Sequence, residues 1–505
     1  MANDTSSDYV LSSKSPSADR LFFLLLLFLT VISLVRIWNS ATGALDLAGD
    51  EAHYWEWSRR PDLSYYSKPP GVSYLIMFGT AVFGDTVLGV RIPAIILSFL
   101  SSLVLYKLGA QLYNKTVGLV CGVSIQIVPL FTACGIGMTP DSPLMFFWIL
   151  SLLFFHRALV TGSPWAWLAF AVSLGLGLLN KYAIAFFYIP VLVMVGLFPQ
   201  NRRHLAKPWF YIAFLLSLLF FMPVVVWNSR HDWVTFRHDL GHANATDGFA
   251  ISFGTLANFL SSQAGVITPL VLVFILYAVI KYRKRDSFCF WFCVPILAIF
   301  LLKSLHGKVQ ANWTLVAYVT GLISFSAYMV ENYRGLSRFP KLVIIAGVGM
   351  AAAASILLHC PQITTQIRLP SGRNPWDRML GWKQLGREVT AMSRDLQKPF
   401  FIFSDSYMTS SELAFYVEGH PTTYCANLGR RMNQYDIWPG FYGLVHYNAI
   451  YVSAGPMAEK LTQAFEQCQT RPLVLYDKRG RKIKEFQVYL CYDFRGMTFE
   501  EPTRF

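Results

Sequence analysis

The chain has 505 residues, of which 54% are hydrophobic and only 14% are charged, and its formal net charge is +14. This composition excludes an intrinsically disordered chain and argues against an ordinary soluble enzyme. In a membrane protein, an excess of Lys and Arg collects in cytoplasmic loops that face anionic lipid, and we prefer that interpretation to nucleic-acid binding. The 8 cysteines include no CxxC pair, so a metal or redox motif of that spacing is not indicated.

The N-terminal part predicts a tail, an anchor and a polar loop. Residues 1–20 are polar and Ser-rich, and we expect them to be disordered. The apolar run 21–37 is long for a signal peptide and fits a retained membrane anchor. Next to it, residues 46–75 read DLAGDEAHYWEWSRRPDLSYYSKPPGVSYL, a dense set of charged, aromatic and turn-forming residues. Charge beside hydrocarbon is costly, so this polar loop calls for a functional explanation.

About eleven transmembrane helices are expected, at roughly 20 apolar residues for each crossing. The run 71–84 is short for a crossing and predicts a helix lying in the membrane interface. The count is open by one or two, because Asn180 and Lys181 interrupt the long apolar run 164–198. The other spans are expected near 88–108, 116–134, 140–159, 164–179, 181–198, 207–227, 262–281, 287–303, 311–330 and 341–358.

The loops predict an orientation. Most loops on one side are rich in Lys and Arg, so the positive-inside rule places them and the N-terminus in the cytoplasm. The first loop, 38–87, with its interfacial helices, then faces the periplasm. Polar residues of unusual type gather on that same face, which indicates a site there.

A change of composition near residue 359 predicts a second domain. Short strands are expected at 399–405, 449–454, 472–477 and 485–494, and amphipathic helices at 383–396 and 457–468. The fold expected is therefore a mostly α-helical polytopic membrane domain over 21–358, followed by a soluble, periplasmic α/β domain over 359–505. An oxidising periplasm would allow disulfides among the four C-terminal cysteines, Cys360, Cys425, Cys468 and Cys491. The sequence does not show which of them pair.

Three carboxylates are candidate catalytic groups. Asp50 at the membrane face is suited to act as a general base, although it also precedes a helix that it would cap. Asp141 begins a later span on the same predicted face and has the same alternative as a helix cap. Glu51 fits best as a first-turn residue that complements the helix dipole.

Six further residues are candidates for binding an anionic lipid donor. A fixed ammonium at headgroup depth suits a lipid phosphate, and the two prolines that follow Lys68 stiffen its backbone. The alternative is a lysine that snorkels to the interface. The remaining candidates are Arg59 and Tyr66 in the polar loop, and His306, Lys308 and Asn312 in a second polar cluster between spans.

The order of these motifs resembles the integral-membrane glycosyltransferases of the GT-C fold. The similar branch contains protein O-mannosyltransferases, lipid A aminoarabinose transferase and bacterial family 39 enzymes. The resemblance is carried by Asp50-Glu51 after the first span, YSKPPG at 66–71, Thr139-Pro140-Asp141, HGKVQANW at 306–313 and NLGRRMNQYDIW at 427–438.

The resemblance implies transfer of a sugar from a polyprenyl-phosphate carrier at the periplasmic face of a bacterial inner membrane. It implies Asp50 as base or acceptor-orienting group, Lys68 on the carrier phosphate, Asp141 as a second acid, and inversion by direct displacement. The acceptor would be lipid A or lipopolysaccharide, another glycan, or a protein hydroxyl. No cofactor is implied, although a divalent metal stays possible, and the expected partners are membrane lipid and the two substrates, with no nucleic acid.

Two other classes of protein compete with this interpretation. A transporter or flippase of a lipid-linked sugar would show paired halves and broken helices at the midplane, whereas the polar residues here collect at one face. A membrane scaffold would explain the C-terminal domain but not the polar loop.

Overall fold

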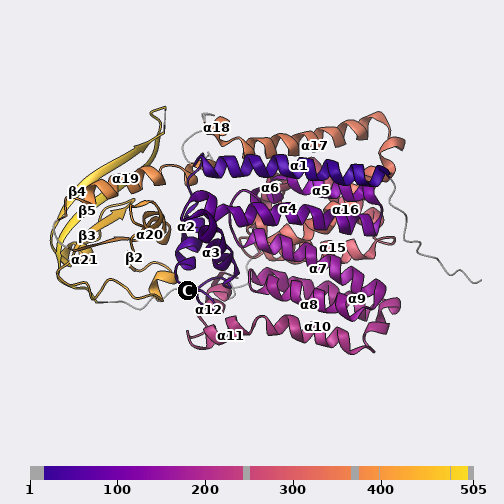
Figure 1. Cartoon of the computed structure of the whole chain (residues 1–505), viewed down its shortest axis with the longest axis horizontal. Coiled ribbons are helices and arrows are strands. Elements are labelled where there is room, and N and C mark those ends of the chain that lie inside the picture. Colours follow the sequence, from indigo (N-terminus) through magenta and orange to yellow (C-terminus); the bar gives the residue numbers. More distant parts are fainter. Residues whose placement is uncertain (1–15, 243–250, 366–374, 397–398, 478, 499–505) are drawn as a thin grey trace, which may run out of the picture.

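The computed structural model describes residues 16–242, 251–365, 375–396, 399–477 and 479–498. Figure 1 shows a helical domain joined at one end to a smaller domain built on a β-sheet. Most of the tail expected over 1–20 lies outside the described residues, but the first helix, α1 (Pro16–Ala41), already begins at Pro16.

Six helices of the described chain are long and apolar enough to cross a membrane. They confirm a mostly helical membrane domain with several spans, while the expected number of eleven stays a prediction. The six are α1, α4 (Val87–Leu112), α7 (Asp141–Thr161), α15 (Ser287–Ser304), α16 (Leu315–Asn332, with the preceding η3, Ala311–Thr314, and the following η4, Tyr333–Gly335) and α17 (Arg338–His359).

Two further apolar segments are bent pairs of helices. The angle is 41° between α10 (Pro208–Leu219) and α11 (Met222–Ser229), and 96° between α13 (Phe253–Ile267) and α14 (Pro269–Tyr282). The continuous helix expected over 262–281 is therefore wrong. Pro269 lacks an N–H and restricts the residue before it, so it starts a new helix instead of continuing the old one.

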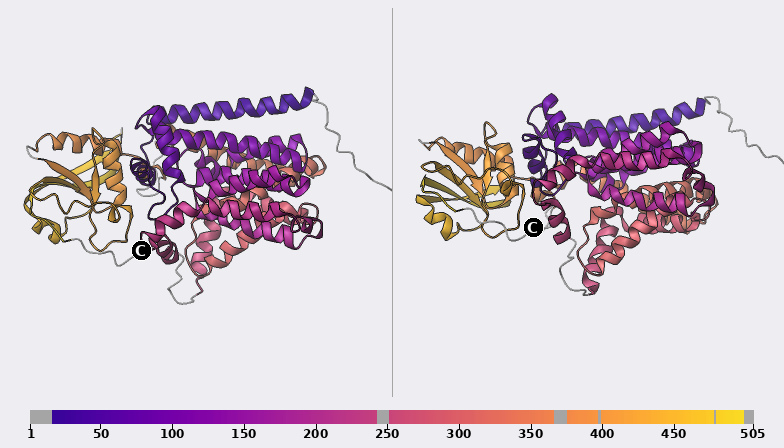
Figure 2. Two further views of the ribbon diagram at one scale, coloured as in Figure 1. Left: turned by 60° about the horizontal axis from the view of Figure 1, so that its bottom comes forward. Right: turned by 90° about the horizontal axis from the view of Figure 1, so that it is seen from below.

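Shorter elements complete the helical domain. They are α5 (Lys115–Ile127), α6 (Pro129–Cys134), α8 (Pro164–Leu178), η1 (Tyr182–Phe187), α9 (Tyr188–Gly196), η2 (Pro199–His204), α12 (Val234–His242) and α18 (Pro361–Thr364). The polar loop forms two helices, α2 (Gly49–Ser58) and α3 (Gly71–Phe83), which lie between the spans and the sheet domain in both views of Figure 2.

The C-terminal domain is built on a five-stranded sheet of order β2-β1-β3-β5-β4. The strands β2 (Thr423–Cys425), β1 (Phe400–Ser404) and β3 (Asn448–Ser453) are parallel, while β5 (Lys482–Phe494) is antiparallel to both β3 and β4 (Phe465–Tyr476). The helical elements of this domain are η5 (Pro375–Met379), α19 (Trp382–Ser393), α20 (Tyr407–Tyr416), η6 (Gln434–Asp436) and α21 (Glu459–Gln463).

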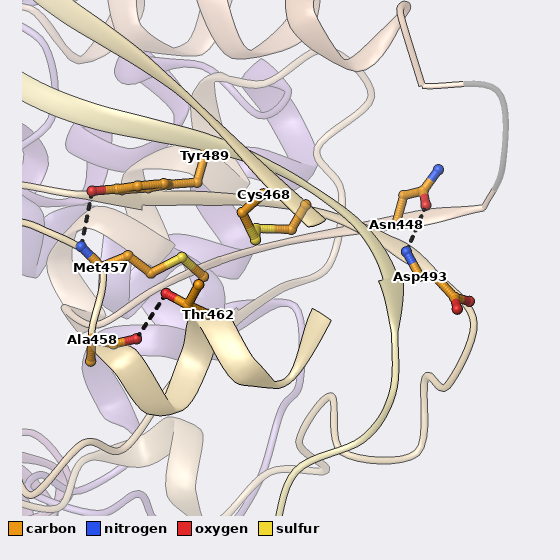
Figure 3. The surroundings of a disulfide bond; sticks show 8 residues. Asn448, Met457, Ala458, Thr462, Cys468, Tyr489 and Asp493 are labelled. Atoms are coloured by element: carbon orange, nitrogen blue, oxygen red, sulfur yellow. Dashed lines mark hydrogen bonds between the residues drawn. A yellow bond between two sulfur atoms is a disulfide. The ribbon is translucent and has the colours of Figure 1, made fainter. Parts of the chain in front are cut away.

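The helix expected over 457–468 is correct only in its middle. The α21 helix ends at Gln463, and from Phe465 the chain pairs with β5, with Cys468 opposite Cys491. These two cysteines form a disulfide, which Figure 3 shows beside Tyr489 and Met457. Cross-strand pairing to a distant partner overrides the amphipathic helical pattern, which a local reading of the sequence cannot detect.

The sheet domain is hydrogen-bonded to the polar loop. The carboxylate of Asp46 accepts hydrogen bonds from the backbone N–H groups of Trp382 (2.8 Å) and Lys383 (3.3 Å), and so caps α19 from the other domain. His53 of α2 lies 2.9 Å from the hydroxyl of Ser411 on α20, and Trp55 packs edge-on against Phe415. These contacts hold α2 between the two domains.

Candidate active site

Asp141 lies at the centre of a polar cluster where the helices meet the polar loop. It is the first residue of α7, after the N-cap residue Pro140, and its side chain makes no capping hydrogen bond. The helix-cap interpretation of Asp141 is therefore wrong. Instead, one carboxylate oxygen accepts from the ammonium of Lys181 at 2.6 Å and the other from the amide of Asn312 at 2.7 Å. Asn312 is thus brought next to Asp141, while its role in binding the donor stays a prediction.

Lys181 received no role from the sequence, although it interrupts an apolar run. It lies at the break between α8 and η1, and its side chain reaches Asp141 at the start of α7. A cation in such a break usually lines a site or pairs with an acid. That interruption was the signal by which Lys181 could have been found.

The YSKPPG segment lies against the same break. The backbone N–H of Gly71 donates to the carbonyl of Leu179 at 2.7 Å. A Cβ atom at Gly71 would lie 2.3 Å from the side-chain oxygen of Asn180, so only glycine permits this approach. The close contact brings Lys68 next to Lys181.

Lys68 is a half-buried cation among other charges. Its ammonium donates to the carbonyl of Ser67 at 2.8 Å. Burial lowers the pKa of Lys68, Asp239 raises it, and the neighbouring ammonium of Lys181 lowers it further. The carboxylates of Asp141 and Asp50 also act on it. Lys68 and Lys181 are thus neighbouring cations, and two neighbouring ammonium groups are able to share a bound phosphate.

Asp50 is exposed on the sheet-domain side of the cluster. The N-cap of α2 is Ala48 and the helix starts at Gly49, so Asp50 is not the cap that the sequence allowed. One of its carboxylate oxygens accepts a hydrogen bond from the hydroxyl of Tyr407, on α20, at 3.0 Å. The exposed carboxylate remains accessible to a substrate hydroxyl. The contribution of Tyr407 was not readable from the sequence, because 357 residues separate the two.

Tyr54 lies one helical turn after Asp50. Burial raises the pKa of Tyr54 well above its ordinary value. The negative charges of Asp50 and, less strongly, Asp141 raise it further. The phenol therefore stays protonated at neutral pH and is able to donate a hydrogen bond. Because both carboxylates raise its pKa, Tyr54 lies close to Asp50 and to Asp141.

Glu51 is brought near the cluster but its oxygens are already used. The guanidinium of Arg91 donates to both carboxylate oxygens, at 2.9 and 2.7 Å. The backbone N–H groups of Ala48 and Met138 each donate to one of them at 2.9 Å. Glu51 and Arg91 are 1% and 2% exposed. This buried ion pair ties the polar loop to α4 and to the turn before α7, a structural role.

Of the other predicted donor-binding residues, Arg59 and Tyr66 contact other partners, and His306 and Lys308 are exposed. The guanidinium of Arg59 pairs with Glu56 at 3.2 Å and donates to the carbonyl of His420 at 2.7 Å. Tyr66 packs in an apolar cluster with Trp227, Val234, Met432 and Ile437, and burial raises the pKa of its phenol to about 12. His306 and Lys308 are exposed on the segment that carries Asn312.

The cluster combines two chemical capacities. Lys68 and Lys181 supply positive charge for an anionic group, and Asp50 supplies an accessible base. Cations aimed at a leaving group stabilise the charge that develops on it, and a carboxylate near a hydroxyl is able to take its proton. The arrangement therefore suits a displacement in which an oxyanion leaves and a hydroxyl attacks.

Comparison with known proteins agrees with this chemistry. The family model of dolichyl-phosphate-mannose-protein mannosyltransferases matches residues 67–227. The lipid A galacturonosyltransferase RgtD of Rhizobium johnstonii is 27% identical over 357 residues, 69% of this chain and 73% of that protein. An undecaprenyl phosphate-α-4-amino-4-deoxy-L-arabinose arabinosyl transferase of Pseudomonas aeruginosa is 32% identical over 147 residues, 28% of this chain and 26% of that protein.

The fold agrees as well. The crystal structure of ArnT from Cupriavidus metallidurans in the apo state superposes with a TM-score of 0.66 at 15% identity, over 94% of this chain and 98% of that one. The same protein bound to undecaprenyl phosphate superposes with a TM-score of 0.64 at 14% identity. Together with the matched sequences, these likenesses identify a polytopic membrane enzyme of the GT-C fold. The chain is a glycosyltransferase, as its motifs predicted.

Proposed function

We propose that this glycosyltransferase moves a sugar from a polyprenyl-phosphate carrier to a glycolipid of the lipid A type, with inversion at the anomeric carbon. The observation that carries the proposal is the meeting of Lys68, Lys181, Asp141 and Asp50, from four separate segments, at one end of the spans. The donor is supported by ArnT, whose crystal structure holds undecaprenyl phosphate, and the acceptor by the lipid A transferase RgtD.

In the proposed step, Asp50 takes the proton of the acceptor hydroxyl while that oxygen bonds to the anomeric carbon. The bond from this carbon to the carrier phosphate breaks, and the phosphate leaves with the electron pair. Lys68 and Lys181 offset the negative charge that develops on the leaving oxygen. Asp141 holds Lys181 and Asn312 in place through its two hydrogen bonds, so its role is to position the cation.

The proposal places the sheet domain and the active site in the periplasm. Two observations support this orientation. The Cys468–Cys491 disulfide requires an oxidising compartment to persist, as the periplasm provides. Basic residues such as Arg202, Arg203 and Lys284 lie at the other end of the spans, where the positive-inside rule expects the cytoplasm.

The direct test uses purified protein in vesicles, a panel of polyprenyl-phosphate sugars and lipid A. Wild type is expected to transfer one sugar of the panel, and Asp50→Asn and Lys68→Ala are each expected to lose more than about a hundredfold, the range of a catalytic acid–base group. Lys284→Ala, at the opposite end of the spans, serves as the matched control. Movement of the lipid-linked sugar across the vesicle membrane without transfer would contradict the proposal and favour a flippase.

A further inference from the structure

Two cavities open where the end of α1 meets the sheet domain, away from the cluster around Asp141. One measures ≈ 580 Å³ and the other ≈ 570 Å³. Both are bordered by the loop after α1, through Thr42, Gly43 and Asp46, and by Lys383 and Arg387 of α19. Figure 1 shows α19 beside the end of α1 and beside α18. The two cavities share these lining residues, so Lys383 and Arg387 border both of them.

The charge of this site is set by Lys383 and Arg387. They lie four residues apart on α19, so both project from one face of the helix, and both are exposed. Within the described ranges, neither side chain has an ion pair or a hydrogen-bond partner. Two unpaired cations at one site attract an anion.

The acidic residues that line the cavities are already engaged. Asp46 caps α19, and Asp477 accepts from the guanidinium of Arg481 at 3.1 Å. Asp85 accepts from the indole of Trp55 at 2.7 Å, and Glu418 pairs with Arg394 at 2.7 Å. None of these four carboxylates is therefore directed at Lys383 or Arg387. Asp46 and Asp85 accept from neutral N–H groups and keep their charge. The larger cavity is lined by the cations Lys383, Arg387 and Arg479 against the carboxylates Asp46 and Asp477, so its formal charge is +1.

A lipid-facing stripe leads along α1 to this site. Phe23, Leu27, Val31, Leu34 and Trp38 are each more than half exposed and recur at intervals of three or four residues, which places them on one face of the helix. The stripe spans about 22 Å at the rise of an α-helix, longer than one leaflet of roughly 15 Å. Trp38 ends the stripe and lines the larger cavity. Acyl chains along α1 would thus place a headgroup at Lys383 and Arg387.

We propose that these two cavities bind the anionic, saccharide-sized headgroup of a glycolipid whose acyl chains lie against α1. The cations recognise a phosphate or carboxylate, and the space on both sides of them exceeds what a small phospholipid headgroup fills. This lipid is the acceptor of the transfer reaction, an assignment that rests on the proposed function. Its headgroup would lie beside residues 42–48, the segment that leads into α2 and Asp50.

The test measures lipid binding without turnover. Full-length protein in phosphatidylcholine nanodiscs is titrated with labelled bisphosphorylated lipid A and, separately, with labelled phosphatidylglycerol. The Lys383→Gln/Arg387→Gln variant is expected to bind lipid A at least about tenfold more weakly, in line with the contribution of two basic residues near a membrane surface. The Lys383→Arg/Arg387→Lys variant keeps both charges and should retain binding.

Two controls separate this inference from the transferase proposal. Lys460→Gln/Arg471→Gln removes the same charge from the same domain, at residues that do not line either cavity, and should bind normally. Lys68→Ala should lose transfer yet keep this binding. Weaker binding of lipid A by the Lys383/Arg387 variant, with or without weaker binding of phosphatidylglycerol, supports the site. Unchanged lipid A binding, or an equal loss in the Lys460/Arg471 control, would overturn it.

Discussion

The ammonium of Lys181 lies 2.6 Å from a carboxylate oxygen of Asp141, although 40 residues separate the two along the chain. The side chains of this pair are 13% and 11% exposed, so solvent screens the pair only in part. Asn312 occupies the other oxygen of Asp141. The pair therefore joins α7, the α8–η1 break and η3 at the site where the donor phosphate is proposed to bind.

If the pair acts as one unit, removing either member should cost about as much as removing both. We expect Asp141→Asn and Lys181→Gln each to lower transfer by about a hundredfold, and the double variant to be no worse than either, because residues acting together are non-additive. The measurement is kcat/KM for the four proteins of the cycle. Glu331→Gln, which breaks an exposed pair with Arg285, should change activity by less than about twofold. If the losses of the two single variants add in the double variant, Asp141 and Lys181 act independently and the prediction is wrong.

The ammonium of Lys68 should limit activity at alkaline pH. Burial lowers its pKa below the usual value of about 10.4, so the ammonium loses its proton at a lower pH than a free lysine does. Since the protonated form is the one that binds phosphate, activity should fall as pH rises through this lowered pKa. Lys68→Arg stays charged over the whole range and should lack that fall, even if its rate is lower. If the Lys68→Arg variant shows the same loss of activity at alkaline pH, that loss arises from another titrating group.

Tyr407 should couple the sheet domain to the chemistry. Tyr407→Phe removes the hydrogen bond to Asp50, and we expect about a tenfold loss of kcat, near the value of one hydrogen bond to a charged group. In an Asp50→Asn background the same change should have little further effect. Tyr447→Phe, at an exposed tyrosine of the same domain, is the control. Full activity in Tyr407→Phe would show that Asp50 needs no such support.

Glu51 should matter for stability and not for the chemical step. Glu51→Gln leaves the buried guanidinium of Arg91 without its anion, and removing one member of such a pair costs about 3–5 kcal/mol. We expect a clear fall in the thermal midpoint, while the folded fraction retains kcat. Glu418→Gln, which breaks an exposed pair with Arg394, should leave the midpoint nearly unchanged. A stable but inactive Glu51→Gln protein would instead make Glu51 a catalytic group.

The orientation predicts the redox state of the C-terminal cysteines. In intact cells, Cys468 and Cys491 should resist alkylation until a reductant is added, because both are held in the disulfide. Mass analysis of the alkylated peptides from membranes gives the result directly. In a strain that lacks periplasmic disulfide formation, the same peptides should alkylate without reductant. Free thiols at both positions in wild-type cells would place the domain in the cytoplasm.

Much of the site was predictable because its residues carry strong local signals. Asp50, Lys68 and Asp141 lie beside apolar spans, where charge is costly, so each stood out in the sequence. For Asp50 and Asp141 the helix-cap alternative could only be removed by the structure, since capping depends on backbone geometry one or two residues away. The strand at Phe465 and the bend at Pro269 were missed because their causes are a distant strand and a single proline within an apolar pattern.

The sequence by itself determined that this is a multi-span membrane protein with a polar loop at one face and a small sheet domain after it. Those features follow from hydrophobic patterning and from the cost of charge near hydrocarbon, which are local properties. Only the tertiary structure decided which charges meet. The pairing of Asp141 with Lys181 and of Asp50 with Tyr407 depends on packing between segments 40 and 357 residues apart, and no pattern within one segment encodes such a partner.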